Sequence, residues 1–289
     1  MNFERLDFVK HRKKFYLFSI SIVIIGALML GVFGLNLGVD FSAGTSLDIT
    51  IGENSANTAE AREILEEGLD LEPIVTIGGD TDNRISARFD RVLTENEREA
   101  ILDRFVDRYG DEVDHEENTV DPQIARELAL KAINAVLIAS IGIIIYVAIR
   151  FEWRFGLAAI IALLYDAFVV ISFFAIFRLE VNIPFVAAVL TVVGYSINDT
   201  IIVFDRIREN LRFAKLKTYD DLAELVNGSI RQTIVRSINT TITVLFVAAM
   251  LLVFGSEAIS VFSVALLVGL TSGVYSTLFI AVQIWMTLK

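Results

Sequence analysis

Residues 194–210 read GYSINDTIIVFDRIREN, and they follow the apolar run IPFVAAVLTVV at residues 183–193. An apolar segment that continues for about 20 residues is typical of a helix that crosses a membrane. Asn198 and Asp199 lie within this segment, whereas Asp205 and Arg206 follow about 9 to 10 Å further along the helix axis. Because an ionised side chain at the centre of a bilayer costs at least about 2.5 kcal/mol, Asp199 is a candidate functional residue of a membrane protein.

Apolar stretches of the same kind predict six transmembrane helices in all. Hydrophobic residues make up 54% of the 289 residues, a share that is typical of membrane proteins. Polar residues at the ends of the second and fifth stretches, among them Asn134 and Asn239, are expected to continue these helices inside a bundle. The six predicted helices cover residues 15–35, 133–149, 155–177, 183–204, 239–254 and 259–286.

The distribution of Lys and Arg predicts how these helices cross the membrane. The short loops on one side contain only Arg178. The basic residues of the opposite side are Arg5, Lys10, Arg12, Lys13, Lys14, Arg150, Arg154, Arg206, Arg208, Arg212, Lys215, Lys217, Arg231 and Lys289. The positive-inside rule then places both termini and a loop at about residues 206–233 in the cytoplasm.

The first apolar stretch, residues 15–35, has two interpretations. Basic residues precede it, as they precede the core of a cleaved signal peptide. Its apolar run is too long for such a core and lacks a small-x-small cleavage pattern, so we expect a helix that remains as a membrane anchor. Residues 1–14 then form a cytoplasmic tail, and residues 36–131 form a domain outside the cell membrane.

The exported segment, residues 36–131, is predicted to be a small α+β domain. It contains 24 acidic and 9 basic residues, a net charge of −15, which argues against nucleic acid or anionic lipid as its ligand. The order β-α-β-β-α-β predicts a ferredoxin-like sandwich, with a turn at residues 78–80. Asn57 and a Thr94–Glu97 capping box are expected to begin the two helices. The predicted strands are residues 46–51, 74–77, 84–89 and 112–120, and the predicted helices are 57–69 and 94–109.

Several classes of site are excluded by what the sequence lacks. There is no cysteine, and therefore no disulfide and no thiolate metal site. His11 and His115 are the two histidines, and neither has partners at the spacing of a zinc site or a catalytic triad. No GxxxxGK[ST] motif for ATP occurs. We therefore expect a protein that is not an enzyme and has no cofactor, and any energy source must be sought in the membrane helices.

Two acids, Asp166 and Asp199, lie deep within predicted helices. Arg236, at the cytoplasmic entrance of the fifth helix, is the natural counter-charge of Asp199, although it could equally be an anchor whose side chain reaches the interface. Asp205 and Arg206 are expected to be structural, at the membrane surface. On the fourth helix, spacings of three and four residues put the polar members of one group on a single face, which we expect to look into the bundle; the group is Thr191, Tyr195, Asn198, Asp199 and Ile202.

The fifth and sixth helices carry further small and polar residues. Hydroxyl and amide groups of the fifth helix could line a wet path beside Arg236. On the sixth helix, small residues favour close approach of helix backbones, so we expect a packing role for them. The residues of the fifth helix are Ser237, Asn239, Thr240, Thr241 and Thr243, and those of the sixth are Gly269, Ser272, Gly273, Ser276 and Thr277.

These residues suggest a transducer of an ion gradient. A carboxyl group in an apolar bundle tends to hold its proton, and a nearby guanidinium favours the ionised form. If Arg236 moved toward and away from Asp199, the acid could alternately release and take up a proton. The membrane potential contributes about 2.3 kcal/mol per charge per 100 mV, which is enough to bias a conformational cycle.

The same stretch closely resembles the most characteristic motif of SecF in the SecD/SecF family of protein-export membrane proteins. Four other segments resemble that family in order and spacing, so the resemblance covers essentially the whole chain. They are GVDFSAGT at residues 38–45, RFEW at 150–153, SIRQTIVRS at 229–237, and FSVALLVG with GVYS at 262–269 and 273–276. The motif residues carried over are Asp40, Phe41, Gly44, Gly194, Tyr195, Ser196, Asp205 and Arg206.

The resemblance implies half of a twelve-helix transporter of the RND superfamily, which pairs with a SecD half. Such complexes associate with the SecYEG channel, and with SecA and YajC- or YidC-type subunits, to draw preproteins through the membrane. The coupling ion is the proton or, in some members, sodium; the lack of a carboxylate-rich cage favours the proton here. The family's relay acid and arginine match Asp199 and Arg236, with Asn198, Asp166 and Thr240 as supporting residues of ion translocation.

One residue departs from the family pattern, and two other functions compete. Ala43 stands where the family usually has the first of two glycines. Since a methyl group limits φ mostly to negative values, we expect any left-handed turn there to be built differently. Met1 lies 14 residues before the first predicted helix, which favours a separate SecF chain over a SecD–SecF fusion. The competing functions are one half of an RND-type exporter of lipids or small molecules, and a translocase scaffold that uses no ion gradient.

Overall fold

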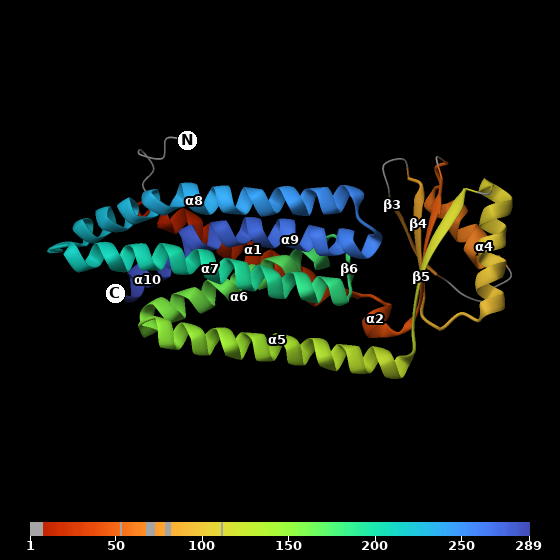
Figure 1. The fold of residues 1–289 in the computed structure, drawn as a ribbon, viewed down its shortest axis with the longest axis horizontal. Helices are drawn as coiled ribbons and strands as arrows, with labels where there is room; N and C mark the ends of the chain where they lie inside the picture. The colour runs from red at the N-terminus through yellow and green to blue at the C-terminus, as the bar shows by residue number, and fades with distance from the viewer. Residues whose placement is uncertain (1–7, 53, 68–72, 79–81, 111) are drawn as a thin grey trace. The chain divides into compact units, whose positions relative to one another are not determined.

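The fold is described from a computed structural model, which covers residues 8–52, 54–67, 73–78, 82–110 and 112–289 (Figure 1). The chain divides into two compact units. A helical unit takes in Met1–Asn36 and Asn134–Lys289, and an α/β unit takes in Leu37–Ile133. Arg5 and part of the turn predicted at residues 78–80 lie outside the described residues.

Six helices are long and apolar enough to cross a membrane, in agreement with the six that the sequence predicts. The last of them contains a π-helical turn, η1, between two α-helical parts. As expected, the second and fifth helices extend well beyond their apolar stretches. The helices are α1 (Arg12–Phe33), α5 (Pro122–Arg150), α6 (Trp153–Ile176), α7 (Ile183–Phe213), α8 (Tyr219–Phe254), and α9 (Glu257–Ser276) with η1 (Thr277–Ala281) and α10 (Val282–Leu288).

Most of the loop predicted at residues 206–233 is helical. The end of α7 and the start of α8 form a hairpin in which residues 214–218 alone, of those described, are not helical. The Asn210 side chain donates hydrogen bonds across it to Ser229 Oγ (2.8 Å) and Gln232 Oε1 (3.2 Å). A capping box between Thr218 and Asp221 begins α8. The apolar-run criterion ended α7 too early and began α8 too late, because it ignores helical residues outside the hydrocarbon core.

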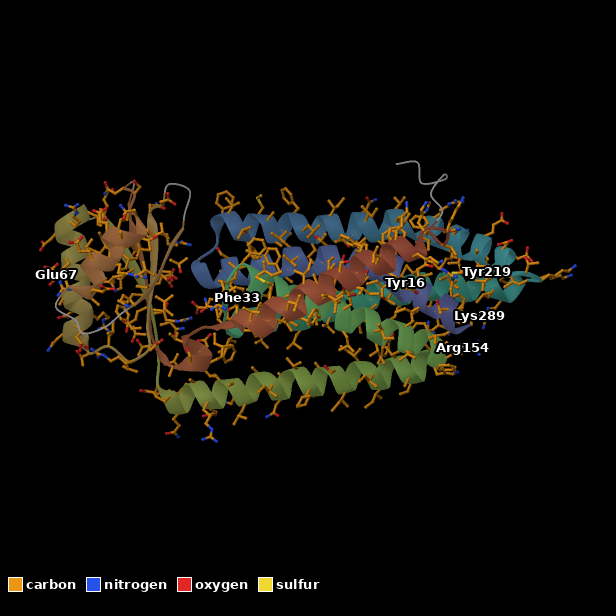
Figure 2. All side chains as sticks on the ribbon, turned by 180° about the vertical axis from the view of Figure 1, so that it is seen from behind. Tyr16, Phe33, Glu67, Arg154, Tyr219 and Lys289 are labelled. Atoms are coloured by element: carbon orange, nitrogen blue, oxygen red, sulfur yellow. The ribbon has the colours of Figure 1, made fainter. Side chains whose placement is uncertain are left out.

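The ends of the helical unit are fixed by side chains that bind backbone groups. At one end, Arg178 Nη1 donates to the carbonyls of Phe33 (2.7 Å) and Gly34 (3.2 Å), which satisfies acceptors that α1 leaves free. At the other end, Asn227 Oδ1 accepts from the amide of Phe8 (2.9 Å). Figure 2 shows Arg154, Tyr219 and Lys289 toward the end opposite to Phe33.

The core of the helical unit lies among α6, α7 and the last span. Phe155 stacks on Trp285 with ring centroids 4.6 Å apart, and it meets Phe204 edge-on at 4.9 Å. These three side chains are at most 4% exposed. In contrast, α1, α5 and α8 leave most of their apolar surface exposed. Both buried acids, Asp166 and Asp199, belong to these central spans.

The α/β unit has the predicted β-α-β-β-α-β order, confirming a ferredoxin-like arrangement. Its antiparallel sheet has the order β3-β4-β2-β5, and α3 and α4 pack on one face over a core that includes Leu47, Ile85 and Phe105 (Figure 1). The elements are β2 (Gly44–Ile51), α3 (Thr58–Glu66), β3 (Ile74–Gly78), β4 (Arg84–Phe89), α4 (Glu95–Tyr109) and β5 (Val113–Val120), with the short β1 (Asn36–Leu37), α2 (Val39–Ser42) and β6 (Glu180–Val181) elsewhere in the chain.

Both predicted helix caps of this unit are present, and they differ in their details. Asn57 Oδ1 accepts from the amide of Glu60 (2.8 Å), but the Glu60 carboxylate pairs with Arg108 (2.8 Å) instead of completing a capping box. The Thr94–Glu97 box is complete. A hydrogen bond from Arg91, followed by those from Thr94, lowers the pKa of Glu97 to about 2.

Where α2 leads into β2, two successive residues have a positive φ: Ala43, between the two elements, and Gly44, the first residue of β2. Ala43 has φ +66°, so the expectation that its methyl group would force another construction is wrong. Gly44 has φ +118°, and a Cβ atom there would lie 2.0 Å from the carbonyl oxygen of Phe89. Since that oxygen belongs to the neighbouring strand β4, only glycine fits at residue 44.

Gly44→Ala is expected to destabilise the α/β unit by about 2 kcal/mol or more, because it adds both left-handed strain and a backbone clash. Hydrogen exchange of the amides in β2 and β4, measured on the whole chain in detergent micelles, reports this loss. Gly78→Ala is the matched control, because a Cβ atom at Gly78 has no neighbour within 4 Å. Equal protection in the two variants would contradict the packing described for Gly44.

Candidate functional site

Asp166 of α6 is enclosed completely by the helical unit, with 0% of its surface exposed. Its carboxylate accepts hydrogen bonds from three serine hydroxyls. Ser196 of α7 and Ser276 of α9 donate to Oδ2, each at 2.6 Å, and Ser272 of α9 donates to Oδ1 at 2.6 Å. These contacts join the three central helices through a single side chain.

Asp199 of α7 is also buried, with 4% of its surface exposed, but it has a different environment. Ser237 of α8 donates to its Oδ1 at 2.6 Å. Its Oδ2 is buried and accepts no hydrogen bond from the residues that the structure describes. Because a carboxylate oxygen can accept two hydrogen bonds, Asp199 can still take up a proton or another donor.

A third polar contact lies one residue beyond Asp199. The hydroxyls of Thr200 in α7 and Thr277 in η1 are 2.9 Å apart and both are buried. Thr277 follows Ser276 directly, so η1 begins where the last span contacts both Asp166 and Thr200. A π-helical turn inside an α-helix is rare and frequently occurs at functional sites.

Arg236 is exposed on α8 and, in the described structure, makes no hydrogen bond or ion pair with Asp199. Its charge nevertheless acts on Asp199 electrostatically. The polar residues of α8 that were expected to line a wet path lie in two different environments. Ser237 and Thr241 are buried, whereas Asn239, Thr240 and Thr243 are exposed.

The polar residues predicted to share one face of α7 do not all look into this chain's bundle. Thr191 and Asn198 are exposed and Tyr195 is half-buried, whereas Asp199 is buried with Ser196 and Thr200. Helical spacing groups residues along a helix, but it cannot tell which of them meet this chain's other helices and which face outward. The exposed stripe along α7 consists of Ala187, Thr191, Gly194 and Asn198.

Asp205 and Arg206 take part in surface ion pairs, as expected of structural residues. Asp205 pairs with Arg150 at 2.6 Å and with Arg208 at 3.2 Å. Arg206 pairs with Glu209 one turn along α7, at 2.7 Å. The contact with Arg150 connects α7 to the end of α5, which sequence spacing alone could not show.

The small residues of α9 have two distinct roles. A Cβ atom on Gly269 would lie 2.3 Å from Val192 Cγ2, and one on Gly273 would lie 3.3 Å from Ser196 Cβ. Both glycines therefore let α9 approach α7 closely. Ser272 and Ser276, which were expected only to pack, instead bind Asp166. Their spacing of four residues, beside an acid deep in another span, was the signal available in the sequence.

The motif residues Asp40, Phe41 and Gly44 lie in the α/β unit. Asp40 is 8% exposed and accepts a hydrogen bond from Asn118 Nδ2 at 3.2 Å. Phe41 is half-buried in α2. Among the residues that the structure describes, no group of three His, Asp or Glu side chains could hold a metal ion. Of the three residues, Gly44 is the one that the turn into β2 requires.

The same segments match known protein families. The profile of "Protein export membrane protein SecD/SecF, C-terminal" matches residues 102–289. The chain belongs to the SecD/SecF family. A second profile, "SecD/SecF GG Motif", matches residues 28–52, which contain the Ala43–Gly44 turn.

Individual SecD/SecF proteins are similar over nearly the whole chain. The chain is 42% identical to the protein translocase subunit SecF of Alicyclobacillus acidocaldarius, over 97% of its own length and 92% of that protein. It is 46% identical to the SecDF subunit of Bacillus subtilis, of which it spans 38%. Crystal structures of SecDF agree: one from Thermus thermophilus has a TM-score of 0.87 at 32% identity, covering 98% of this chain and 38% of that one. The chain is thus a SecF-type translocase subunit, a multi-pass transport protein.

Gly269→Ala is expected to destabilise the helical unit by about 1–3 kcal/mol, since the added methyl group overpacks the contact with Val192. The fraction of folded chain that survives heating in detergent, measured by size-exclusion chromatography, reports this effect. Gly194→Ala is the control on the facing helix, because a Cβ atom there meets nothing within 4 Å. If both variants survive equally, the close approach of α7 and α9 is not as described.

Proposed function

We propose that this SecF-type chain forms one half of a motor that couples proton movement across the membrane to preprotein export. The proposal rests on Asp199, an acid that is buried within the membrane helices. One of its carboxylate oxygens accepts a hydrogen bond from Ser237, and the other is buried and accepts none from the described residues. A buried acid is costly within a membrane, and it is functional in most proteins that retain one.

The surroundings of Asp199 favour the proton over sodium as the coupling ion. A hard cation is surrounded by several oxygen ligands, commonly six or more in the case of Ca²⁺. Among the described residues, a single hydroxyl, that of Ser237, is bound to Asp199. A proton needs a single oxygen atom to bind to, and Asp199 Oδ2, which accepts no hydrogen bond from the described residues, can supply it.

In the proposed cycle, Arg236 controls the charge of Asp199. When the guanidinium approaches, the ionised carboxylate is favoured and the proton leaves; when it withdraws, the buried acid takes up a proton again. Arg236 is exposed on α8 and acts on Asp199 through its charge, without a direct bond. Its long side chain can therefore move without breaking the contact between Ser237 and Asp199.

A SecD-type half is the partner that this helical unit requires. The exposed stripe of α7 is small and polar, and the exposed side of α8 beside it carries Arg236, Asn239 and Thr240. Polar groups on membrane helices are usually covered by other helices, and small residues let those helices approach. The relatives named SecDF contain a similar chain as 38% of a longer protein, which supports a SecD-type partner in the remainder.

The proposed orientation places both termini in the cytoplasm and the α/β unit outside. Arg154, Tyr219 and Lys289 gather at one end of the helical unit, together with the basic hairpin of α7 and α8 (Figure 2). The positive-inside rule assigns that end to the cytoplasm. The outer unit would then meet preproteins that leave the SecYEG channel, with SecA and YajC- or YidC-type subunits acting in the same assembly.

The relay is tested in proteoliposomes that contain the chain, a SecD-type partner and SecYEG, with proton and sodium gradients imposed separately. A proton gradient is expected to accelerate preprotein export, and Asp199→Asn or Arg236→Ala is expected to reduce the rate to that seen without a gradient. Asp220→Asn, which removes an exposed carboxylate at the start of α8, is the matched control and should keep the full response. An undiminished response in Asp199→Asn would overturn the relay through Asp199, and acceleration by sodium alone would exclude the proton.

The partner surface is tested by adding bulk to the α7 stripe. Gly194→Leu should leave this chain folded, since nothing lies within 4 Å of that position, but it should reduce co-purification of a SecD-type partner about fivefold or more. Gly142→Leu on α5 is the matched control, because Gly142 is also exposed and without close neighbours. Equal recovery of the partner with both variants would place the interface elsewhere.

A further inference from the structure

We infer that Asp166 is a second proton-binding group, separate from Asp199, and that Ser276 reverses its hydrogen bond when Asp166 gains or loses a proton. The two acids use different neighbours: Asp166 is bound by α7 and α9, whereas Asp199 is bound by α8. This inference deepens the proposed function and rests on it for the route by which the proton arrives.

The Asp166 carboxyl group is fully enclosed, and its hydrogen-bonding partners are hydroxyl groups. Asp166 and Ser276 are 0% exposed, Ser196 is 2% exposed and Ser272 is 8% exposed. The titratable groups on the elements packed around it are the phenols of Tyr165 and Tyr275 and, one turn along α7 from Ser196, Asp199. In the described structure no Lys, Arg or His side chain is bonded to Asp166. An ionised Asp166 would therefore be a buried charge without a cation beside it.

The hydrogen bonds around Asp166 fit both the ionised and the protonated acid. Each serine hydroxyl has one proton to donate. In the ionised state all three serines can donate to the carboxylate. In the protonated state Asp166 itself becomes a donor, so one serine must accept and direct its own proton elsewhere. Of the three, Ser276 has such a second acceptor, the carbonyl oxygen of Gly273 at 3.2 Å.

The change between the two states needs no movement of heavy atoms. On protonation, an O–H bond forms at Asp166 Oδ2 with a proton that comes from the aqueous phase. The Ser276 hydroxyl rotates from Asp166 toward the Gly273 carbonyl and then accepts the new hydrogen bond from Asp166. Deprotonation reverses each step. Ser196 continues to donate to the same Oδ2 in both states.

The reversal occurs next to the π-helical turn of the last span. Ser276 is the last residue of α9, and Thr277, which contacts Thr200 of α7, is the first of η1. The proton on Asp166 thus alters a contact at the junction between α9 and η1. Asp199 lies on α7 between Ser196 and Thr200, so both acids act on the same segment of that helix.

Infrared spectroscopy of the whole chain in lipid vesicles tests this inference, with aspartate labelled at the carboxyl carbon to identify its bands. An Asp199→Asn background removes the other membrane acid. At about pH 7 water-exposed aspartates are ionised, since their ordinary pKa is about 3.9. We expect a band of protonated aspartate to remain at that pH and to vanish when Asp166→Asn is added.

Two serine variants assign the band even if Asp166→Asn fails to fold. Ser272→Ala removes a donor to the ionised acid, so the band should persist to a pH about one unit higher. Ser276→Ala removes both a donor to the ionised acid and the acceptor of the protonated acid, so its two effects oppose each other and the band should shift less than in Ser272→Ala. Absence of the band at about pH 7, or a shift in Ser276→Ala as large as that in Ser272→Ala, would overturn the inference. Absence of gradient-dependent export with the unsubstituted chain, while the band is intact, would instead overturn the proposed function.

Discussion

A carboxylate that is removed from water must be surrounded by hydrogen-bond donors of the protein, and this requirement organises the helical unit. Asp166 of α6 meets it with hydroxyls from α7 and α9. Those hydroxyls reach the acid because Gly269 and Gly273 let α7 and α9 approach closely. The aromatic core of Phe155, Phe204 and Trp285 then packs the same three spans further along. A polar contact and a small-residue contact thus fix the same helices in the same register.

The two membrane acids differ in whether this chain supplies all of their hydrogen-bond partners. Asp166 is satisfied wholly from within, whereas Asp199 has one open oxygen and lies beside α8, whose polar outer side is uncovered. A single chain therefore contains a complete polar site and an incomplete one. The incomplete site lies where we propose that a SecD-type partner binds.

Much of the fold is determined by local patterns in the sequence, and for this reason it could be predicted from the sequence. Hydropathy predicts the six spans, and period-two and period-3.6 patterns predict the order of the α/β unit. The Thr94 cap is encoded within four residues. The Asp166 site could not be predicted in this way, because its serines lie 30, 106 and 110 residues away in sequence. The direction of the α7 face also depends on a neighbour that helical spacing does not specify, and Ala43 keeps its left-handed turn despite its methyl group.

The π-helical turn η1 determines which direction, around the helix axis, the residues at the end of the last span face. A π-turn holds one more residue than an α-turn, and one residue corresponds to a rotation of about 100° around the helix axis. Residues after Ala281 therefore face a different direction from the one that a continuous α-helix would give them. Ser276 can meet Asp166 while Trp285 stacks on Phe155, although both partners lie on α6. The extra residue thus allows the last span to make both a polar and an aromatic contact with α6. In an unbroken helix, the two contacting side chains would be rotated relative to each other by a further angle of more than a quarter of a turn.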